Sequence, residues 1–135
     1  MAVLVDTGVL YALADKDDDW HERARQWASA TREFLLVPVV VLPEAAYLIG
    51  TRLGPKAEQI FISSLAAEEL GVEPLKRADL IRSAALMAQF PHIGFVDAGV
   101  LAIAERLRIT TIATTDRRHF ASVRLSHVES LTLVP

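Results

Sequence analysis

The chain of 135 residues contains no cysteine, which excludes a disulfide framework, a thiolate nucleophile and a zinc site built on cysteine. It also lacks a long hydrophobic run. Its longest apolar stretch, residues 34–43, contains two prolines and falls short of the roughly 18 residues that a membrane-spanning helix needs. No basic leader followed by an apolar core and a small-residue cleavage site is visible, so we expect no secretory signal, no membrane association and a cytoplasmic location.

An excess of positive charge is missing as well, since the formal net charge is -3. Proteins that bind nucleic acids are usually basic. Four of the 17 acidic residues lie against apolar segments, however, and assigning them to a metal site leaves 13 acids facing 14 bases. Eleven of these bases are arginine, the better bidentate ligand for phosphate. Net charge alone therefore neither excludes nor identifies a nucleic-acid substrate.

Hydrophobic periodicity predicts short apolar strands that alternate with amphipathic helices. The expected strands cover residues 3–5, 35–37, 72–74, 111–113 and 130–134, and the expected helices cover 7–14, 20–30, 39–53, 56–70, 77–90 and 98–107. In the helix 77–90, Leu80, Ile81 and Ala84 are expected to face inward. Such alternation is typical of an α/β fold, a three-layer α/β/α sandwich with a central, mostly parallel sheet. Without an internal repeat or linker, we expect a single domain over residues 1–135.

Four carboxylates end or interrupt the apolar segments: Asp6, Glu44, Asp97 and Asp116. A carboxylate is costly to bury unless it is paired, hydrogen-bonded or bound to a cation. In parallel α/β sheets, ligands gather at the carboxyl ends of the strands. The predicted topology would therefore bring all four carboxylates to one edge of the sheet.

Each aspartate also has a simpler explanation when it is taken alone. Asp6 and Asp97 would cap the helices that follow them, and Asp116 would cap the turn at Arg117. Glu44 follows a proline among apolar residues and has no such explanation. Taken together, the four acids indicate a site for Mg²⁺ or Mn²⁺, because hard cations prefer carboxylate oxygens and activate water for attack on a phosphodiester.

Several neighbouring polar residues are candidates for supporting roles. The hydroxyls of Thr7, Thr114 and Thr115 would orient carboxylates or bind metal-bound water, although threonine also simply suits a strand end.

Phosphate contacts are expected first from Arg117 and Arg118, and then from Arg52 and Arg82, although a surface arginine often has no such role. His119 would either touch substrate or make a structural contact beside Phe120, and the sequence favours the structural contact.

The order of these segments resembles that of the PIN-domain nucleases. The resemblance is carried by Val-Asp-Thr at residues 5–7, a glutamate in the third helix, Asp97-Ala98 before residues 101–104, and Thr-Thr-Asp-Arg-Arg-His-Phe at residues 114–120. The small size and the run 10–15 continuing to Trp20-His21 make the chain most similar to VapC-type toxins of bacterial toxin–antitoxin pairs. The resemblance covers nearly the whole chain.

This resemblance implies a PIN fold and a metal-dependent endoribonuclease. Asp6, Asp97 and Glu44 would hold the principal Mg²⁺ or Mn²⁺ ion, and Asp116 would complete the site or hold a weaker second ion. It also implies a cognate VapB-type antitoxin seated in a hydrophobic groove, a homodimer and a higher toxin–antitoxin complex, with RNA as substrate. The exposed parts of helices 45–53 and 80–88 would supply the apolar patch of the dimer.

Three alternatives stay open at this point. The chain could be a degenerate PIN domain that acts only as a binding module in a complex, or a housekeeping nuclease that processes RNA. A phosphoryl-accepting domain built around Asp6 is disfavoured, because haloacid-dehalogenase-like enzymes need a second aspartate where this chain has Gly8. For the metal site, Pro43 is compatible with Glu44 only if the proline lies in the first turn of its helix or kinks it.

Overall fold

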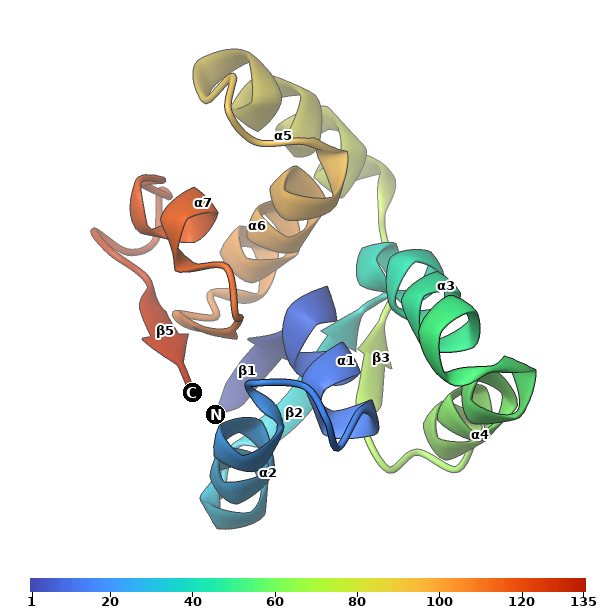
Figure 1. The fold of residues 1–135 in the computed structure, drawn as a ribbon. Coiled ribbons are helices and arrows are strands. Elements are labelled where there is room, and N and C mark those ends of the chain that lie inside the picture. The colour runs from blue at the N-terminus through green and yellow to red at the C-terminus, as the bar shows by residue number, and fades with distance from the viewer.

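Five short strands form one sheet in which every neighbouring pair is parallel (Figure 1). The computed structural model describes all of residues 1–135. The strands are β1 (Ala2–Val5), β2 (Phe34–Pro38), β3 (Gly71–Glu73), β4 (Thr111–Ala113) and β5 (Thr132–Val134). Their spatial order is β3-β2-β1-β4-β5. The chain therefore builds outward from β1 on one side and returns beside β1 on the other, which makes the junction of β1 and β4 the topological switch point.

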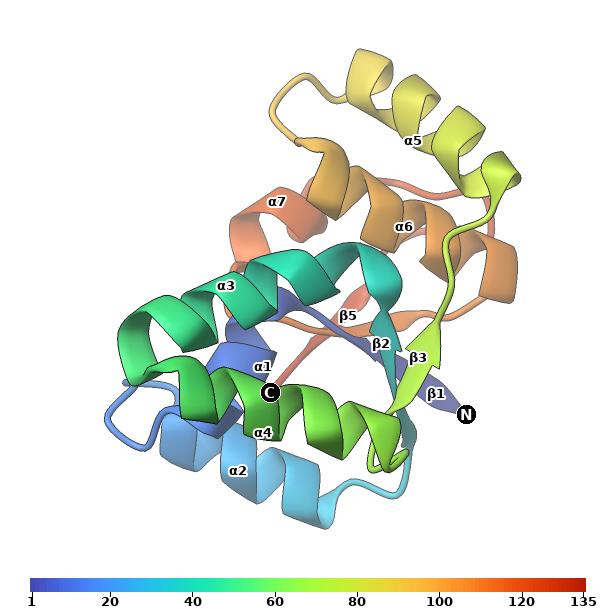
Figure 2. The same cartoon turned by 90° about the vertical axis from the view of Figure 1, so that its right-hand side faces the viewer.

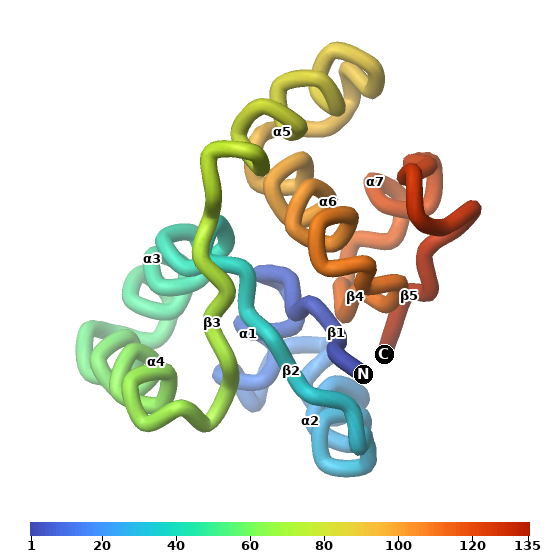
Figure 3. The backbone as a smooth tube through the Cα atoms, turned by 180° about the vertical axis from the view of Figure 1, so that it is seen from behind, coloured from blue at the N-terminus to red at the C-terminus, as the bar shows by residue number.

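Helices cover both faces of this sheet. They are α1 (Thr7–Ala14), α2 (His21–Ala30), α3 (Leu42–Leu53), α4 (Pro55–Ala66), α5 (Arg77–Gln89), α6 (Phe95–Leu107) and the short α7 (Arg117–Ala121), with a 3₁₀ turn, η1, at Val39–Val41. In Figure 2, α6 lies above the strands and α2 lies below them, and Figure 3 shows the same order from behind. Figure 2 shows α5 packed on α6, and α3 beside α4. The predicted three-layer α/β/α sandwich is confirmed.

The core is centred on β1 and α6. Val3, Leu4 and Val5 are buried in the middle of the sheet, and α6 is buried continuously from Ala98 to Ala104. A helix that is apolar all round is typical of such an interior position. A Cβ on Gly99 would lie 3.1 Å from a methyl group of Val40, so the glycine permits the close approach of α6 to η1. This packing fixes where the first turn of α6 lies relative to β1.

Three element boundaries differ from the sequence prediction in ways that bear on function. The predicted helix 39–53 divides into η1 and α3, and Pro43 lies in the first turn of α3, where the missing amide proton costs nothing. Helix α6 begins at Phe95, three residues earlier than expected. Helix α7 was not expected at all, because five residues are too few to carry a periodic pattern.

The predicted inward face of α5 is wrong. Leu80 is 49% exposed and Ile81 is 65% exposed, whereas Asp79, Ser83 and Leu86 are buried. The side chain of Asp79 accepts a hydrogen bond from the backbone amide of Lys76 at 2.9 Å and pairs with Nε of Arg106 in α6 at 3.0 Å. A buried ion pair thus takes the place that apolar residues would fill.

None of the helices combines the length and the hydrophobicity required to cross a membrane.

Candidate active site

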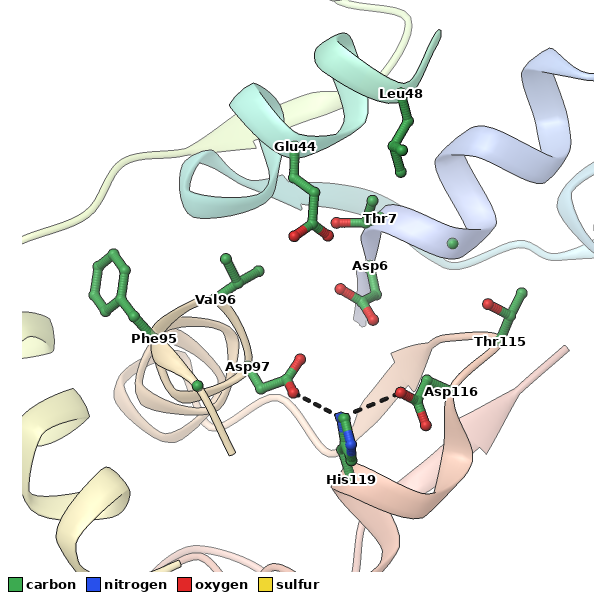
Figure 4. Close-up of a pocket in the computed structure, with 12 residues that line it drawn as sticks. Asp6, Thr7, Glu44, Leu48, Phe95, Val96, Asp97, Thr115, Asp116 and His119 are labelled. Carbon is green, nitrogen blue, oxygen red and sulfur yellow. Dashed lines mark hydrogen bonds and ion pairs between the residues drawn. The ribbon is translucent and has the colours of Figure 1, made fainter. Parts of the chain in front are cut away.

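A cavity of about 490 Å³ opens at the carboxyl ends of β1 and β4, between the first turns of α3 and α6 (Figure 4). All four carboxylates singled out in the sequence line it. The remaining lining residues are Thr7, Gly8, Leu48, Gly94, Phe95, Val96, Thr115 and His119. No lysine or arginine lines the cavity, so nothing with a permanent positive charge offsets the four acids.

Each of the four carboxylates stands at the N-terminal end of a helix. Asp6 directly precedes α1 and Asp116 directly precedes α7, while Glu44 and Asp97 are the third residues of α3 and α6. The positive end of a helix dipole stabilises a negative group there. Figure 4 shows the four side chains directed into one shared space. The four helix ends thus gather the acids that the parallel topology was expected to bring to one edge; their metal-binding roles stay a prediction.

The capping interpretation of the aspartates is confirmed only in position, and only for two of them. Asp6 and Asp116 occupy the N-cap positions of α1 and α7, but neither side chain makes a capping hydrogen bond. Asp97 lies inside α6, whose N-cap is Gly94. Helix capping therefore does not account for the direction of these carboxylates.

Burial perturbs two of these acids. Asp6 is only 7% exposed, and burial raises its pKa to about 6, with the charges of Asp97 and Glu44 adding to the effect. The nearby backbone amide of Thr7 and the hydrogen bond from the Thr114 hydroxyl oppose this shift. Burial also raises the pKa of Asp97; His119 opposes the shift, and the neighbouring acids reinforce it. A carboxyl group with such a raised pKa favours a protonated or cation-bound state.

His119 occupies the mouth of this acidic cluster, which the sequence analysis did not predict. Its Nδ1 lies 2.9 Å from Oδ2 of Asp97 and 3.1 Å from Oδ2 of Asp116. The structural contact that the sequence favoured is present, with Asp97 and Asp116 as its partners, while the adjacent Phe120 is buried; a contact between His119 and substrate stays a prediction. The spacing of three residues from Asp116 would have indicated this position only if α7 had been recognised as a helix.

The three threonines lie in or beside the site. Thr114 is fully buried, donates a 3.0 Å hydrogen bond to Oδ2 of Asp6 and accepts one from the backbone amide of Asp116. Thr115 lines the cavity next to Gly8, where an added Cβ would lie only 2.0 Å from the Thr115 hydroxyl. Oγ1 of Thr7 is buried and has no hydrogen-bond partner, so the site holds an oxygen that its own residues leave unsatisfied.

The arginines lie outside the cavity. Arg117 and Arg118 are exposed on α7, and Arg117 donates a hydrogen bond to the carbonyl oxygen of Pro135. The guanidinium of Arg52 lies 5.1 Å from the ring centroid of Tyr11. Arg82 is bound through two nitrogens to the carboxylate of Glu105, at 2.7 and 3.2 Å. These bonds engage two of the guanidinium nitrogens of Arg82, and a contact between Arg82 and phosphate stays a prediction.

The donor set of the cavity fits a hard divalent cation. Four carboxylates and an unpartnered hydroxyl supply only oxygen, which Mg²⁺ and Mn²⁺ prefer. As placed, no three acidic or histidine side chains are drawn together tightly enough to form a metal-binding group. Asp97 and Asp116 each direct one oxygen to His119, and Asp6 directs one to Thr114. The cavity therefore fits a divalent cation in the type of its ligand atoms and in its position in the fold.

Comparison with known proteins agrees with this geometry. Ribonuclease VapC26 of Mycobacterium tuberculosis is 29% identical over 135 residues, covering 98% of this chain and 100% of the relative. Among solved structures, VapC20 of M. tuberculosis, a sarcin-ricin loop cleaving toxin, superimposes with a TM-score of 0.83 at 20% identity, over 93% of this chain and 98% of that one. VapBC2 of Rickettsia felis, bound to a promoter DNA fragment, superimposes with a TM-score of 0.71 at 16% identity, over 98% of this chain and 97% of that one.

The model of the PIN domain family matches residues 3–125, which include every residue that lines the cavity. The resemblance found in the sequence is confirmed at this level: the chain belongs to the PIN-domain family.

Proposed function

We propose that this protein is a metal-dependent endoribonuclease of the VapC type, which hydrolyses phosphodiester bonds in RNA. The observation that carries the proposal is a cavity with four carboxylates and no lysine or arginine, placed at the switch point between β1 and β4. A relative named as a ribonuclease spans the whole chain at 29% identity, which supports RNA as the substrate class.

Asp6, Asp97 and Glu44 would hold the principal Mg²⁺ or Mn²⁺ ion, and Asp116 would complete the site. When bound, the ion activates water and neutralises charge that develops on the phosphodiester. The chain itself positions the ligands. Thr114 fixes one oxygen of Asp6, and burial keeps bulk water away from that carboxylate. The unpaired hydroxyl of Thr7 is available to a water molecule or to substrate in the cavity.

Arg117 and Arg118 remain the proposed contacts for the RNA backbone. Both lie on α7, directly after Asp116. Because contacts to phosphate position a nucleic acid without reading its sequence, they would hold the RNA over the cavity and leave target choice to other residues.

A VapB-type antitoxin is the proposed partner. Two similar structures support it: a VapBC2 complex from R. felis and a toxin–antitoxin complex from Klebsiella pneumoniae. A second cavity of about 460 Å³ between α1 and α4, lined mostly by apolar residues such as Leu10, Leu13 and Phe61, suits an apolar segment of such a partner. We also propose a homodimer through the exposed apolar side chains Tyr47, Leu80 and Ile81, a higher complex with antitoxin, and a cytoplasmic location.

The test is cleavage of total bacterial RNA by the purified protein, freed of any antitoxin. Mg²⁺, Mn²⁺ and EDTA are compared, with Asp97→Asn as the control for contaminating nuclease. We expect discrete fragments that require metal and vanish with the Asp97→Asn protein, and mapping their ends identifies the target. Absence of metal-dependent cleavage by a folded sample that binds RNA would favour a binding module, and trimming of RNA precursors alone would favour a housekeeping role.

A further inference from the structure

We infer that His119 is a positioning residue of the metal site. Its Nδ1–H donates a hydrogen bond to one oxygen of Asp97 and stands 3.1 Å from one oxygen of Asp116, and thereby sets how the second oxygen of each carboxylate is presented to a divalent cation. The inference rests on the proposed function, since it concerns the same metal site. It adds to the four acids a residue that binds no metal itself.

The hydrogen-bond geometry assigns the proton to Nδ1. An ionised carboxylate can only accept hydrogen bonds, and Nδ1 lies within hydrogen-bond range of Oδ2 of Asp97 and within 3.1 Å of Oδ2 of Asp116. A neutral imidazole with its hydrogen on Nδ1 satisfies this arrangement. The Oδ1 atoms of Asp97 and Asp116 accept no hydrogen bond from any other residue of the chain. Each acid therefore keeps one oxygen available for a cation.

The two carboxylates come from different elements, and like charges at close range repel. Asp97 lies in the first turn of α6, whereas Asp116 lies in the connection from β4 to α7 (Figure 4). The charge of Asp116 contributes to the raised pKa of Asp97. The imidazole of His119 stands between them, with its Nδ1 bonded to Asp97 and in close contact with Asp116, and thereby limits the orientation of both side chains. No side chain other than that of His119 contacts both Asp97 and Asp116.

The backbone of His119 is fixed by its neighbour Phe120, which is buried in the core and anchors α7. The ring centroid of His119 lies 6.3 Å from that of His92, which precedes α6. The rings of Phe90 and His92 are nearly perpendicular with centroids 6.2 Å apart, and Oγ of Ser122 lies 2.9 Å from Nε2 of His92. Loss of an outer-shell group that hydrogen-bonds a metal ligand weakens metal affinity or activity about 10- to 100-fold.

Mn²⁺ binding without RNA tests the inference, measured by isothermal titration calorimetry on folded, antitoxin-free protein. We expect His119→Ala to weaken binding by about 10- to 100-fold. His119→Asn places an amide N–H near the position of Nδ1 and is expected to bind Mn²⁺ close to wild type. His119→Gln places its amide near Nε2 and is expected to behave like His119→Ala. His21→Ala is the matched control, because His21 contacts the carbonyl of Ala12 outside the cavity.

The outcomes separate this inference from the proposed function. Failure of the wild type to bind Mn²⁺ overturns the metal site and the inference with it. Binding by the wild type, with unchanged affinity in His119→Ala, overturns the inference alone. Tighter binding by His119→Ala does so as well, because His119 would then compete with the cation. If His119→Ala does not fold, the contrast between the Asn and Gln variants decides, and equal affinities for these two contradict the role of Nδ1.

Discussion

The hydroxyl of Thr114 donates a 3.0 Å hydrogen bond to Oδ2 of Asp6, joining residues 108 positions apart in the chain. Both side chains are buried, and they stand at the ends of the adjacent strands β4 and β1. This bond orients the most deeply buried carboxylate of the cavity, but it does not cancel the cost of charging it, since the pKa of Asp6 still lies at about 6.

Replacing Asp6 by asparagine is expected to stabilise the metal-free protein at neutral pH. The folded-state pKa of about 6 exceeds the ordinary value of 3.8, so between these values the folded state binds more protons and its stability falls as pH rises. Above pH 7, ionisation of Asp6 therefore lowers the free energy of unfolding by about 3 kcal/mol. The asparagine side chain cannot ionise, and its amide oxygen can still accept the hydrogen bond from the Thr114 hydroxyl. In urea unfolding with EDTA, we expect Asp6→Asn to gain about 1–3 kcal/mol at pH 7.5 and little at pH 4. An equal gain at both pH values would contradict the assignment.

The same raised pKa predicts that protons compete with the cation. A divalent ion binds the ionised carboxylate, so Mn²⁺ affinity is expected to fall by about tenfold or more for each pH unit below 6. Calorimetric titration at pH 5 and pH 7.5 measures this difference. Equal affinities at the two pH values would show that Asp6 does not bind the ion.

Substitution of Gly8 by alanine is expected to impair RNA cleavage by about tenfold or more, because small displacements of reacting groups are costly. The new Cβ would lie 2.0 Å from Oγ1 and 3.2 Å from Cβ of Thr115, which forces α1 away from the segment that carries Asp116. The added Thr115→Gly change removes both contacts, so the double variant is expected to be as active as Thr115→Gly alone. Gly50→Ala is the matched control, because its new Cβ would meet only the carboxylate end of Glu58 and its neighbouring side-chain atoms outside the cavity. Equal losses in the two alanine variants would contradict a local effect.

The buried ion pair between α5 and α6 is expected to matter for stability and not for cleavage. Asp79 is 2% exposed and accepts hydrogen bonds from Arg106 and from the backbone amide of Lys76, whereas Arg106 is also paired with Glu73. Asp79→Ala removes these bonds while Arg106 keeps Glu73, and is expected to lower the free energy of unfolding by about 2–3 kcal/mol. Arg82→Ala breaks a more exposed pair and is expected to cost about 1 kcal/mol or less. Chemical denaturation measures both, and a larger loss for Arg82→Ala would reverse this ranking.

Arg118 is expected to contribute one phosphate contact. In an Asp97→Asn background that prevents cleavage, Arg118→Ala should weaken RNA binding for all sequences and reduce the slope of log affinity against log salt by about 1. Arg124→Ala, on another exposed arginine farther along the chain, should leave that slope unchanged. Fluorescence anisotropy over a salt series measures it, and identical slopes for the two variants would exclude the contact.

The sequence allowed most of the architecture to be predicted, because short apolar strands and amphipathic helices have distinct periods. The four acids stood out because each carboxylate lay against apolar residues. The inward face of α5 could not be predicted, since its burial depends on Arg106, which lies 27 residues from Asp79. The position of His119 depends on a helix of five residues and on an aspartate in another element. Contacts between distant segments leave no periodic signal in either segment.

The placement of β1 between β2 and β4 also determines when the cavity can assemble during translation. The segment that carries Asp6 and Glu44 is made before β4, and it contains both β1 and β2, which pair with each other. Strand β4, and with it Asp116 and His119, is made much later, yet it must dock against β1 to complete the cavity. A nascent chain that stops before β4 therefore holds three of the four acids, Asp6, Glu44 and Asp97, and no assembled pocket. The strand order delays any activity of this site until the segment through residue 119 has left the ribosome.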